Sequence, residues 1–238
     1  MRRPAIIQIQ PFDRLGRFQN AWLNARYHFS FGQYRDPARQ GVGGLVVWND
    51  DEIAPGTGFD PHPHREMEII TYVREGAITH RDSLGNEGRT EAGDIQVMHA
   101  GTGITHAEYN LEATPTRLFQ IWIHPGTRGV APGWGARKFP RTSSNVLTAM
   151  ADGRAGADGS ALPLYADAAV LAGTIKAGES VTHALGKGRV GYLVAATGTV
   201  SVNGAAVGTR DGVTVTGEDS ITITASADAE VVLVDVVG

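Results

Sequence analysis

The chain has 238 residues, including 31 glycines and no cysteine, and its formal net charge at pH 7 is −4. The lack of cysteine excludes disulfides, thiol catalysis and cysteine-ligated metal sites, and the mildly acidic balance argues against a broad basic surface for nucleic acid. The sequence contains neither a run of about 18 or more apolar residues, which a membrane-spanning helix needs, nor the apolar segment of a secretory signal peptide. We therefore expect a cytoplasmic protein that does not bind nucleic acid directly.

Short apolar runs rich in β-branched residues recur along the chain with turn residues between them, which predicts an all-β fold. In the first half these runs are residues 44–48, 69–73, 95–98 and 118–123. The polar residues 49–52 are predicted to act as turn residues after the first run, and residues 82–86 to form a hairpin turn.

The middle of the chain is predicted to be less regular. Residues 125–135 hold several glycines and prolines, and a short helix is expected over residues 144–151. The glycine-rich residues 152–160 are expected to form a surface loop near the junction of the two halves. Strand-length runs then follow at residues 170–176, 190–195, 199–202, 213–216, 220–224 and 230–237.

The two halves share a weak internal repeat. In each half a strand-length run ends at a glycine, Gly76 or Gly198, and the chain returns after a hairpin to a second glycine, Gly93 or Gly217. Self-similarity of this kind predicts two copies of one β module. We expect the first module to span residues 1–140 and the second residues 141–238.

Two pairs of side chains have the spacing of metal ligands. Residues at i and i+2 of a strand point to the same face, so His62 and His64 can reach one ion, as can His106 and Glu108. Pro63 fits only at a sheet edge, a strand start or a bulge. Three imidazoles and one carboxylate suit a single divalent ion, either Fe(II), Mn, Ni, Cu or Zn.

The segments around these pairs resemble the pirin family of cupin proteins. Gly56, His62, His64 and Glu68 resemble the first cupin motif, and the stretch from Gly93 through His106 resembles the second. The runs NDDEIAPGTGF, HPHREMEIITYVREGAITHRDSLGN, GDIQVMHAGTGITHAEYN and QIWIHP carry the more specific likeness to pirins. The resemblance covers roughly the first 140 residues.

The resemblance implies a bicupin of two tandem double-stranded β-helix (jelly-roll) barrels, in which only the N-terminal barrel binds metal. The ligands would be the residues that match the family pattern, His62, His64, His106 and Glu108, and Fe(II) is the favoured ion. Many other cupins use the carboxylate of the first motif, here Glu68, which leaves open whether Glu68 or Glu108 is the ligand. If Glu108 is the ligand, Glu68 is expected to line the pocket or to contact the metal ligands, and the same is expected of His99.

The resemblance also implies an activity. Bacterial pirin-like proteins of this type resemble quercetin 2,3-dioxygenases, which open the central ring of flavonols with O₂ and release carbon monoxide. Glu108 would then take the proton of the flavonol hydroxyl, and Phe59, Ile70 and Met98 are expected to line an apolar pocket.

Two alternatives stay open. In the first, the protein is a non-catalytic metal- or redox-sensing pirin that binds a transcription factor or a metabolic enzyme. In the second, it is another small-molecule metalloenzyme, because a fold does not determine a function. The remaining histidines, among them His28, His80, His124 and His183, are expected to be structural or to lie on the surface.

Overall fold

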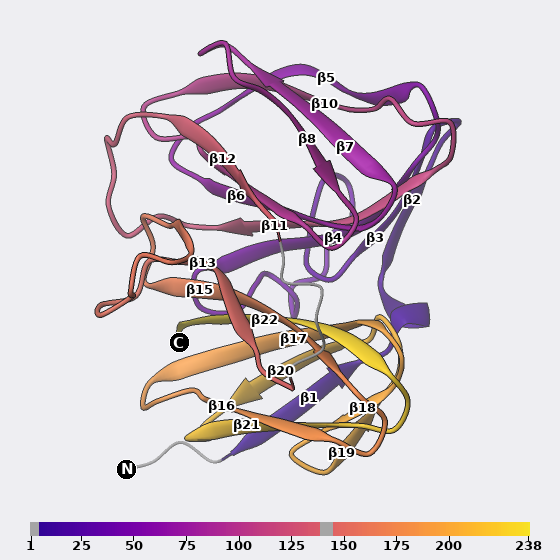
Figure 1. The fold of residues 1–238 in the computed structure, drawn as a ribbon, viewed down its shortest axis with the longest axis vertical. Coiled ribbons are helices and arrows are strands. Elements are labelled where there is room, and N and C mark those ends of the chain that lie inside the picture. Colours follow the sequence, from indigo (N-terminus) through magenta and orange to yellow (C-terminus); the bar gives the residue numbers. More distant parts are fainter. Residues whose placement is uncertain (1–4, 139–144) are drawn as a thin grey trace.

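The computed structural model of the protein describes residues 5–138 and 145–238 (Figure 1). Within these ranges it consists of 22 strands and one short 3-10 helix, η1 (Phe12–Arg14), which confirms the all-β prediction. No helix in the described ranges has the length and apolar character that crossing a membrane requires. The expected division between residues 140 and 141 lies outside the described residues.

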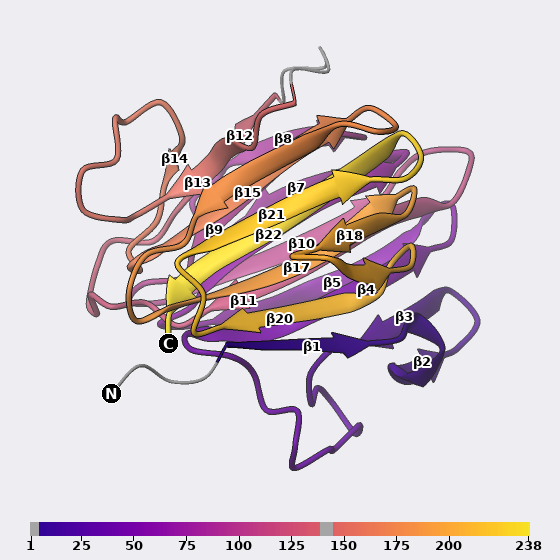
Figure 2. The ribbon, with the colours of Figure 1, turned by 90° about the horizontal axis from the view of Figure 1, so that it is seen from below.

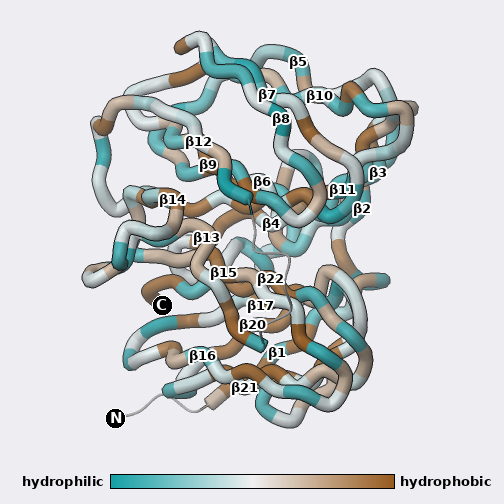
Figure 3. Tube along the Cα trace, in the orientation of Figure 1, coloured by the Kyte–Doolittle hydropathy of each residue, from teal (hydrophilic) through white to brown (hydrophobic). Residues whose placement is uncertain are grey.

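The first module consists of a large and a small sheet. The large sheet has the order β12 (Gly133–Arg137), β9 (Ile95–His99), β6 (Glu68–Glu75), β11 (Thr116–Ile123), β4 (Leu45–Ile53), β3 (Leu23–Tyr27) and β2 (Gly16–Gln19). The small sheet has the order β5 (Thr57–His64), β10 (Ile104–Asn110), β7 (Ala77–Asp82) and β8 (Glu87–Glu91). In Figure 3 the polar sequence of β8, EGRTE, appears as a mainly hydrophilic segment, whereas β7 begins with the buried apolar residues Ala77 and Ile78.

The second module has the same design. Its large sheet has the order β1 (Ile6–Gln10), β20 (Gly212–Thr216), β17 (Arg189–Thr197), β22 (Ala229–Val237), β15 (Ala168–Ile175), β13 (Thr148–Asp152) and β14 (Leu162–Pro163). Its small sheet has the order β16 (Ser180–Ala184), β21 (Ser220–Ala225), β18 (Val200–Val202) and β19 (Ala205–Val207). Gly76 and Gly198 both have positive φ directly after β6 and β17, which hold the same place in their sheets, and this backbone conformation favours glycine. Gly93 and Gly217 also have positive φ, but they are not equivalent: Gly93 precedes β9, whereas Gly217 follows β20, which takes the place of β9 in the second sheet. This part of the predicted repeat is therefore wrong.

The edge strand of the second module comes from the start of the chain. β1 pairs in antiparallel register with β20, so that Ile6 lies opposite Thr216 and Gln10 opposite Gly212 (Figure 2). The equivalent edge of the first module is filled by β12, which pairs with β9. Residues 6–10, which belong to the range expected to form the first module, therefore extend the sheet of the second, and this pairing ties the two modules together.

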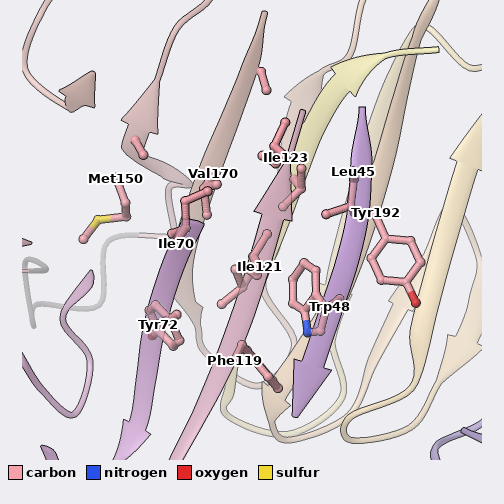
Figure 4. Packing of buried hydrophobic residues seen from close by; sticks show 14 of the residues in the cluster. Leu45, Trp48, Ile70, Tyr72, Phe119, Ile121, Ile123, Met150, Val170 and Tyr192 are labelled. Atoms are coloured by element: carbon pink, nitrogen blue, oxygen red, sulfur yellow. The ribbon is translucent and has the colours of Figure 1, made fainter. Parts of the chain in front are cut away.

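The largest apolar cluster lies between the two modules. The two seven-stranded sheets face each other there, and the buried side chains come from both, with Trp48, Tyr72 and Phe119 on one side and Val170 and Tyr192 on the other (Figure 4). The Trp48 and Tyr192 ring centroids are 5.4 Å apart. Because this cluster removes the outer face of each large sheet from water, the two modules form one hydrophobic unit.

Two local predictions are wrong. Residues 49–52 continue strand β4 instead of forming a turn. Two of their polar side chains are paired on one face of the sheet, since Asp50 forms ion pairs with Arg74 and Arg210, while Glu52 pairs with Arg117. The expected helix over residues 144–151 is not formed in its described part, because residues 148–151 belong to strand β13, which pairs with β15 of the large sheet. Tertiary pairing overrides local propensity in both places.

Candidate metal centre

Strands β5 and β10 bring three histidines together. The two strands are antiparallel neighbours, and His62 lies directly opposite His106 in their register. A register shift between His106 and Glu108 marks a bulge in this pair. β5 is the edge strand of the small sheet. A proline such as Pro63 can be accommodated in an edge strand, because no hydrogen bond to a further strand is lost there.

The imidazole nitrogens of the three histidines converge. One nitrogen each of His62, His64 and His106 lies within 4.8 Å of the others. The ring centroids of His62 and His106 are 4.5 Å apart, and those of His64 and His106 are 5.1 Å apart. Neighbouring imidazoles at these distances cannot all be protonated without strong repulsion.

The three histidines have the properties of ligands for a divalent metal. Burial, followed by the nearby His106 and His62, lowers the pKa of His64 to about 4. Burial, followed by the nearby His62 and His80, lowers the pKa of His106 to about 3. Both rings are therefore neutral at pH 7, which is the form that binds a metal.

The hydrogen bonds of these rings also fit a metal. Nε2 of His64 and both ring nitrogens of His106 are buried without a hydrogen-bond partner among the described residues. His62 Nδ1 lies 2.7 Å from the Asp60 carbonyl oxygen. A hydrogen bond from Nδ1 to this oxygen leaves Nε2 as the free ligand atom, a common arrangement behind metal-bound histidines. The residues present therefore fit a divalent ion that favours imidazole nitrogen.

Glu108 reaches from the small sheet to the inner face of the large sheet. Gln96 Nε2 donates to Glu108 Oε1 at 2.6 Å, and Gln120 Nε2 donates to Oε2 at 2.8 Å. Thr71 Oγ1 donates to Oε1 at 3.1 Å. These donors stand in one row across β9, β6 and β11, because Thr71 lies opposite both Gln96 and Gln120 in register. The row holds the carboxylate in one orientation.

The three histidines and Glu108 line one cavity of about 290 Å³. Side chains from β3, β4, β5, β6 and β11 and from the segment after β3 complete its wall, and most of them are apolar or aromatic. They are Leu23, Tyr27, Phe31, Asn49, Asp51, Phe59, Ile69, Gln120 and Trp122. Such a cavity, largely apolar with a few convergent polar groups, is the usual form of a small-molecule site.

Of the three residues expected to line the pocket, Phe59 does so. Ile70 instead belongs to the cluster between the modules, and Met98 packs in a separate small cluster with Ile69 and Ala100. Ile70 follows Ile69 on β6, so it points to the opposite face of the sheet.

Glu68 and His99 lie on the other face of the large sheet and do not line the cavity. They are opposite each other in the β6–β9 register, and His99 Nδ1 is 2.6 Å from Glu68 Oε2. The Tyr165 backbone N–H donates to the same oxygen at 3.2 Å. The turn between β5 and β6, in which Glu66 has φ of 50°, breaks the alternation that would otherwise place Glu68 beside His62.

The other four histidines lie outside the cavity lining. His28 is buried and its Nδ1 lies 2.8 Å from the Tyr192 hydroxyl oxygen. His80 stacks on Trp134 and is bonded to Asp82, while His183 is bonded to Asp235. His124 is exposed.

The apolar runs in the sequence predicted strands, but they did not identify the polar residues that donate hydrogen bonds to Glu108. Thr71, Gln96 and Gln120 each interrupt an otherwise apolar strand and are buried, with exposed fractions of 1%, 3% and 7%. A polar residue in the middle of a buried strand needs a hydrogen-bond partner, and this is the signal that could have identified all three. Asn49 and Asp51, both on β4, were concealed by the assignment of residues 49–52 to a turn.

Two acidic side chains in the wall of the cavity, Asp51 and Tyr27, have raised pKa values. Burial, reinforced by the carboxylates of Asp50 and Glu108, raises the pKa of Asp51 well above its usual range. Burial, followed by the charge of Asp51, raises the pKa of Tyr27 to about 12. Both shifts favour the uncharged forms of these two groups in the cavity wall.

We expect His106 to lower the stability of the metal-free protein as the pH falls from 7.5 to 5. Its pKa is about 3 in the folded state, so the unfolded chain binds a proton that the folded chain excludes, which removes about 2 kcal/mol from the free energy of unfolding. Because the raised pKa of Asp51 acts in the opposite direction, the measurement is the pH dependence of urea unfolding in a chelator for the wild type relative to His106→Gln. The variant should lose less stability over this range, and a His124→Ala control should behave as the wild type does. An equal pH dependence in the wild type and in His106→Gln would contradict the prediction.

Comparisons with known proteins agree with this architecture. The sequence model of the pirin family matches residues 9–123, and that of the quercetinase C-terminal cupin domain matches residues 151–236. A pirin-like protein of Caulobacter vibrioides is 58% identical over 97% of this chain and 99% of its own. A quercetin 2,3-dioxygenase of Escherichia coli is 38% identical over 97% of this chain and 98% of its own.

A solved structure shows the same arrangement of two modules. The bacterial pirin YhhW from Escherichia coli, in complex with nickel(II), superimposes with a TM-score of 0.91 and 35% identity, covering 98% of this chain and 99% of that one. The fold is therefore that of two tandem cupin modules, as expected from the sequence.

Proposed function

The chain belongs to the pirin family, and on this premise we propose that it is a metal-dependent dioxygenase that cleaves flavonols such as quercetin with O₂ and releases carbon monoxide. The observation that carries the proposal is the convergence of three histidines on a cavity of about 290 Å³ with aromatic walls. The relative from Escherichia coli that is named quercetin 2,3-dioxygenase supports the reaction class.

We assign the metal to the module formed mainly by residues 1–140, with His62, His64, His106 and Glu108 as its ligands. Fe(II) is the proposed ion, although Mn, Ni, Cu and Zn accept the same ligand types. When bound, the ion would act as a Lewis acid that stabilises the deprotonated flavonol and holds it close to O₂. The module formed mainly by residues 141–238 is proposed to support the first module without a metal of its own.

The side chains around the cavity have separate tasks in this proposal. Glu108 takes the proton of the flavonol hydroxyl, and the hydrogen bonds from Gln96, Gln120 and Thr71 keep its carboxylate pointed at the substrate. Phe59 and Trp122 are among the apolar walls that hold the flat aromatic rings and exclude water. Holding the reactants in one orientation lowers the entropy cost of their encounter.

The test is oxygen uptake by iron-loaded protein with quercetin, with carbon monoxide measured in the same vessel. We expect oxygen and carbon monoxide in equal amounts, and no consumption by metal-free protein. Unchanged quercetin in the presence of fully loaded protein would contradict the proposed reaction. That result would favour a pirin that senses metal or redox state and binds a protein partner.

A further inference from the structure

Strand β4 contributes two polar side chains to the cavity that have unused hydrogen-bonding capacity. Asn49 and Asp51 are 4% and 2% exposed, and both line the cavity. Asn49 Oδ1 and Asp51 Oδ1 are buried without a hydrogen-bond partner among the described residues. Asp50, between them, points to the opposite face, where Arg74 and Arg210 pair with it. The two unpaired oxygens therefore lie on the cavity side of β4, whereas the carboxylate between them is satisfied on the other side.

The neighbouring polar residues are already engaged elsewhere. Gln120 lies opposite Asn49 in the β11–β4 register, but its amide nitrogen donates to Glu108. Thr71 and Gln96 are bonded to the same carboxylate. The large sheet thus presents two polar regions to the cavity, one satisfied around Glu108 and one open at Asn49 and Asp51.

A buried polar atom without a partner is costly, and at a cavity wall a ligand can supply the missing bond. The amide oxygen of Asn49 accepts a hydrogen bond from a hydroxyl group. The Asp51 carboxyl group accepts one as well, through its buried Oδ1 atom. The other walls are apolar and largely aromatic. These features together match an aromatic ring that carries hydroxyl groups.

We propose that Asn49 and Asp51 form a second binding subsite, separate from the metal, that recognises ring hydroxyl groups of a polyhydroxylated aromatic substrate. The subsite rests on the proposed function only in taking a flavonol as that substrate. It makes the protein select flavonols with additional ring hydroxyls over those that carry the 3-hydroxyl alone.

The test compares quercetin with 3-hydroxyflavone, which shares the 3-hydroxyl but has no other. Binding to metal-loaded protein is measured by calorimetry without oxygen, so that no turnover occurs. Asn49→Ala and Asp51→Ala are expected to weaken quercetin binding about 10-fold, the effect of removing one partner of a buried hydrogen bond. Neither substitution should alter 3-hydroxyflavone binding appreciably.

Two further variants separate recognition from folding. Asp51→Asn keeps the shape and can both donate and accept, so we expect it to retain most of the selectivity for quercetin. Glu52→Ala, on the opposite face of the same strand, is the matched control and should bind both flavonols as the wild type does. Equal weakening of both flavonols in the Asp51→Ala variant would overturn the subsite.

The result does not depend on catalysis. Wild-type protein that binds quercetin no more tightly than 3-hydroxyflavone, including protein that binds neither, overturns the subsite. Selective binding that is lost in the two alanine variants, but without oxygen uptake when O₂ is admitted, supports the subsite and contradicts the dioxygenase proposal.

Discussion

Replacing Glu108 by glutamine is expected to lower the rate of flavonol cleavage by about 100- to 10,000-fold, the usual effect of removing a general base. The substitution keeps the size of the side chain and its contacts with Gln96 and Gln120, whose amides can rotate to suit the new group. It removes the negative charge and the capacity to accept a proton. The measurement is the rate of oxygen uptake with quercetin at equal metal content.

Glu68→Gln is the matched control, because Glu68 is the other buried carboxylate that the cupin motifs single out. It lies outside the cavity lining and is bonded to His99. We expect this variant to keep its metal and its activity but to lose about 1–3 kcal/mol of stability, because the buried side chain that contacts His99 and accepts from the Tyr165 backbone N–H is altered. Loss of activity in Glu68→Gln with an active Glu108→Gln variant would transfer the carboxylate role to Glu68.

Replacing His106 by alanine is expected to lower the affinity for the divalent ion by at least about 100-fold, since even partners behind the ligands are worth 10- to 100-fold. His106 is buried and both its ring nitrogens lack another partner among the described residues. The measurement is metal content after dialysis against a weak chelator. Circular dichroism of the same samples shows whether the variant is folded.

His124→Ala is the control for this variant, because His124 is exposed and lies outside the cavity lining. It should keep the metal content of the wild type. Full metal retention by a folded His106→Ala variant would contradict the proposed ligand set, since two histidines from β5 would then suffice.

Local patterns in the sequence were enough to predict the all-β fold and the shared face of the first two histidines. The alternation of strand side chains places His62 and His64 on one face whatever surrounds them. The glycine-bounded repeat likewise predicted two equivalent modules, because positive φ at Gly76 and Gly198 is a local backbone property. These features depend on residues that are near one another in the chain.

What only the tertiary structure decided depends on contacts between distant segments. β1 completes the sheet of the second module because its partner is β20, about two hundred residues later. Glu108 and not Glu68 lines the cavity because the turn after β5 interrupts the alternation that would otherwise relate Glu68 to the histidines. Asn49 and Asp51 read as turn residues in isolation, and pairing of β4 with β3 and β11 makes them part of a buried strand. Register and burial are set by the partner strand, which no local pattern contains.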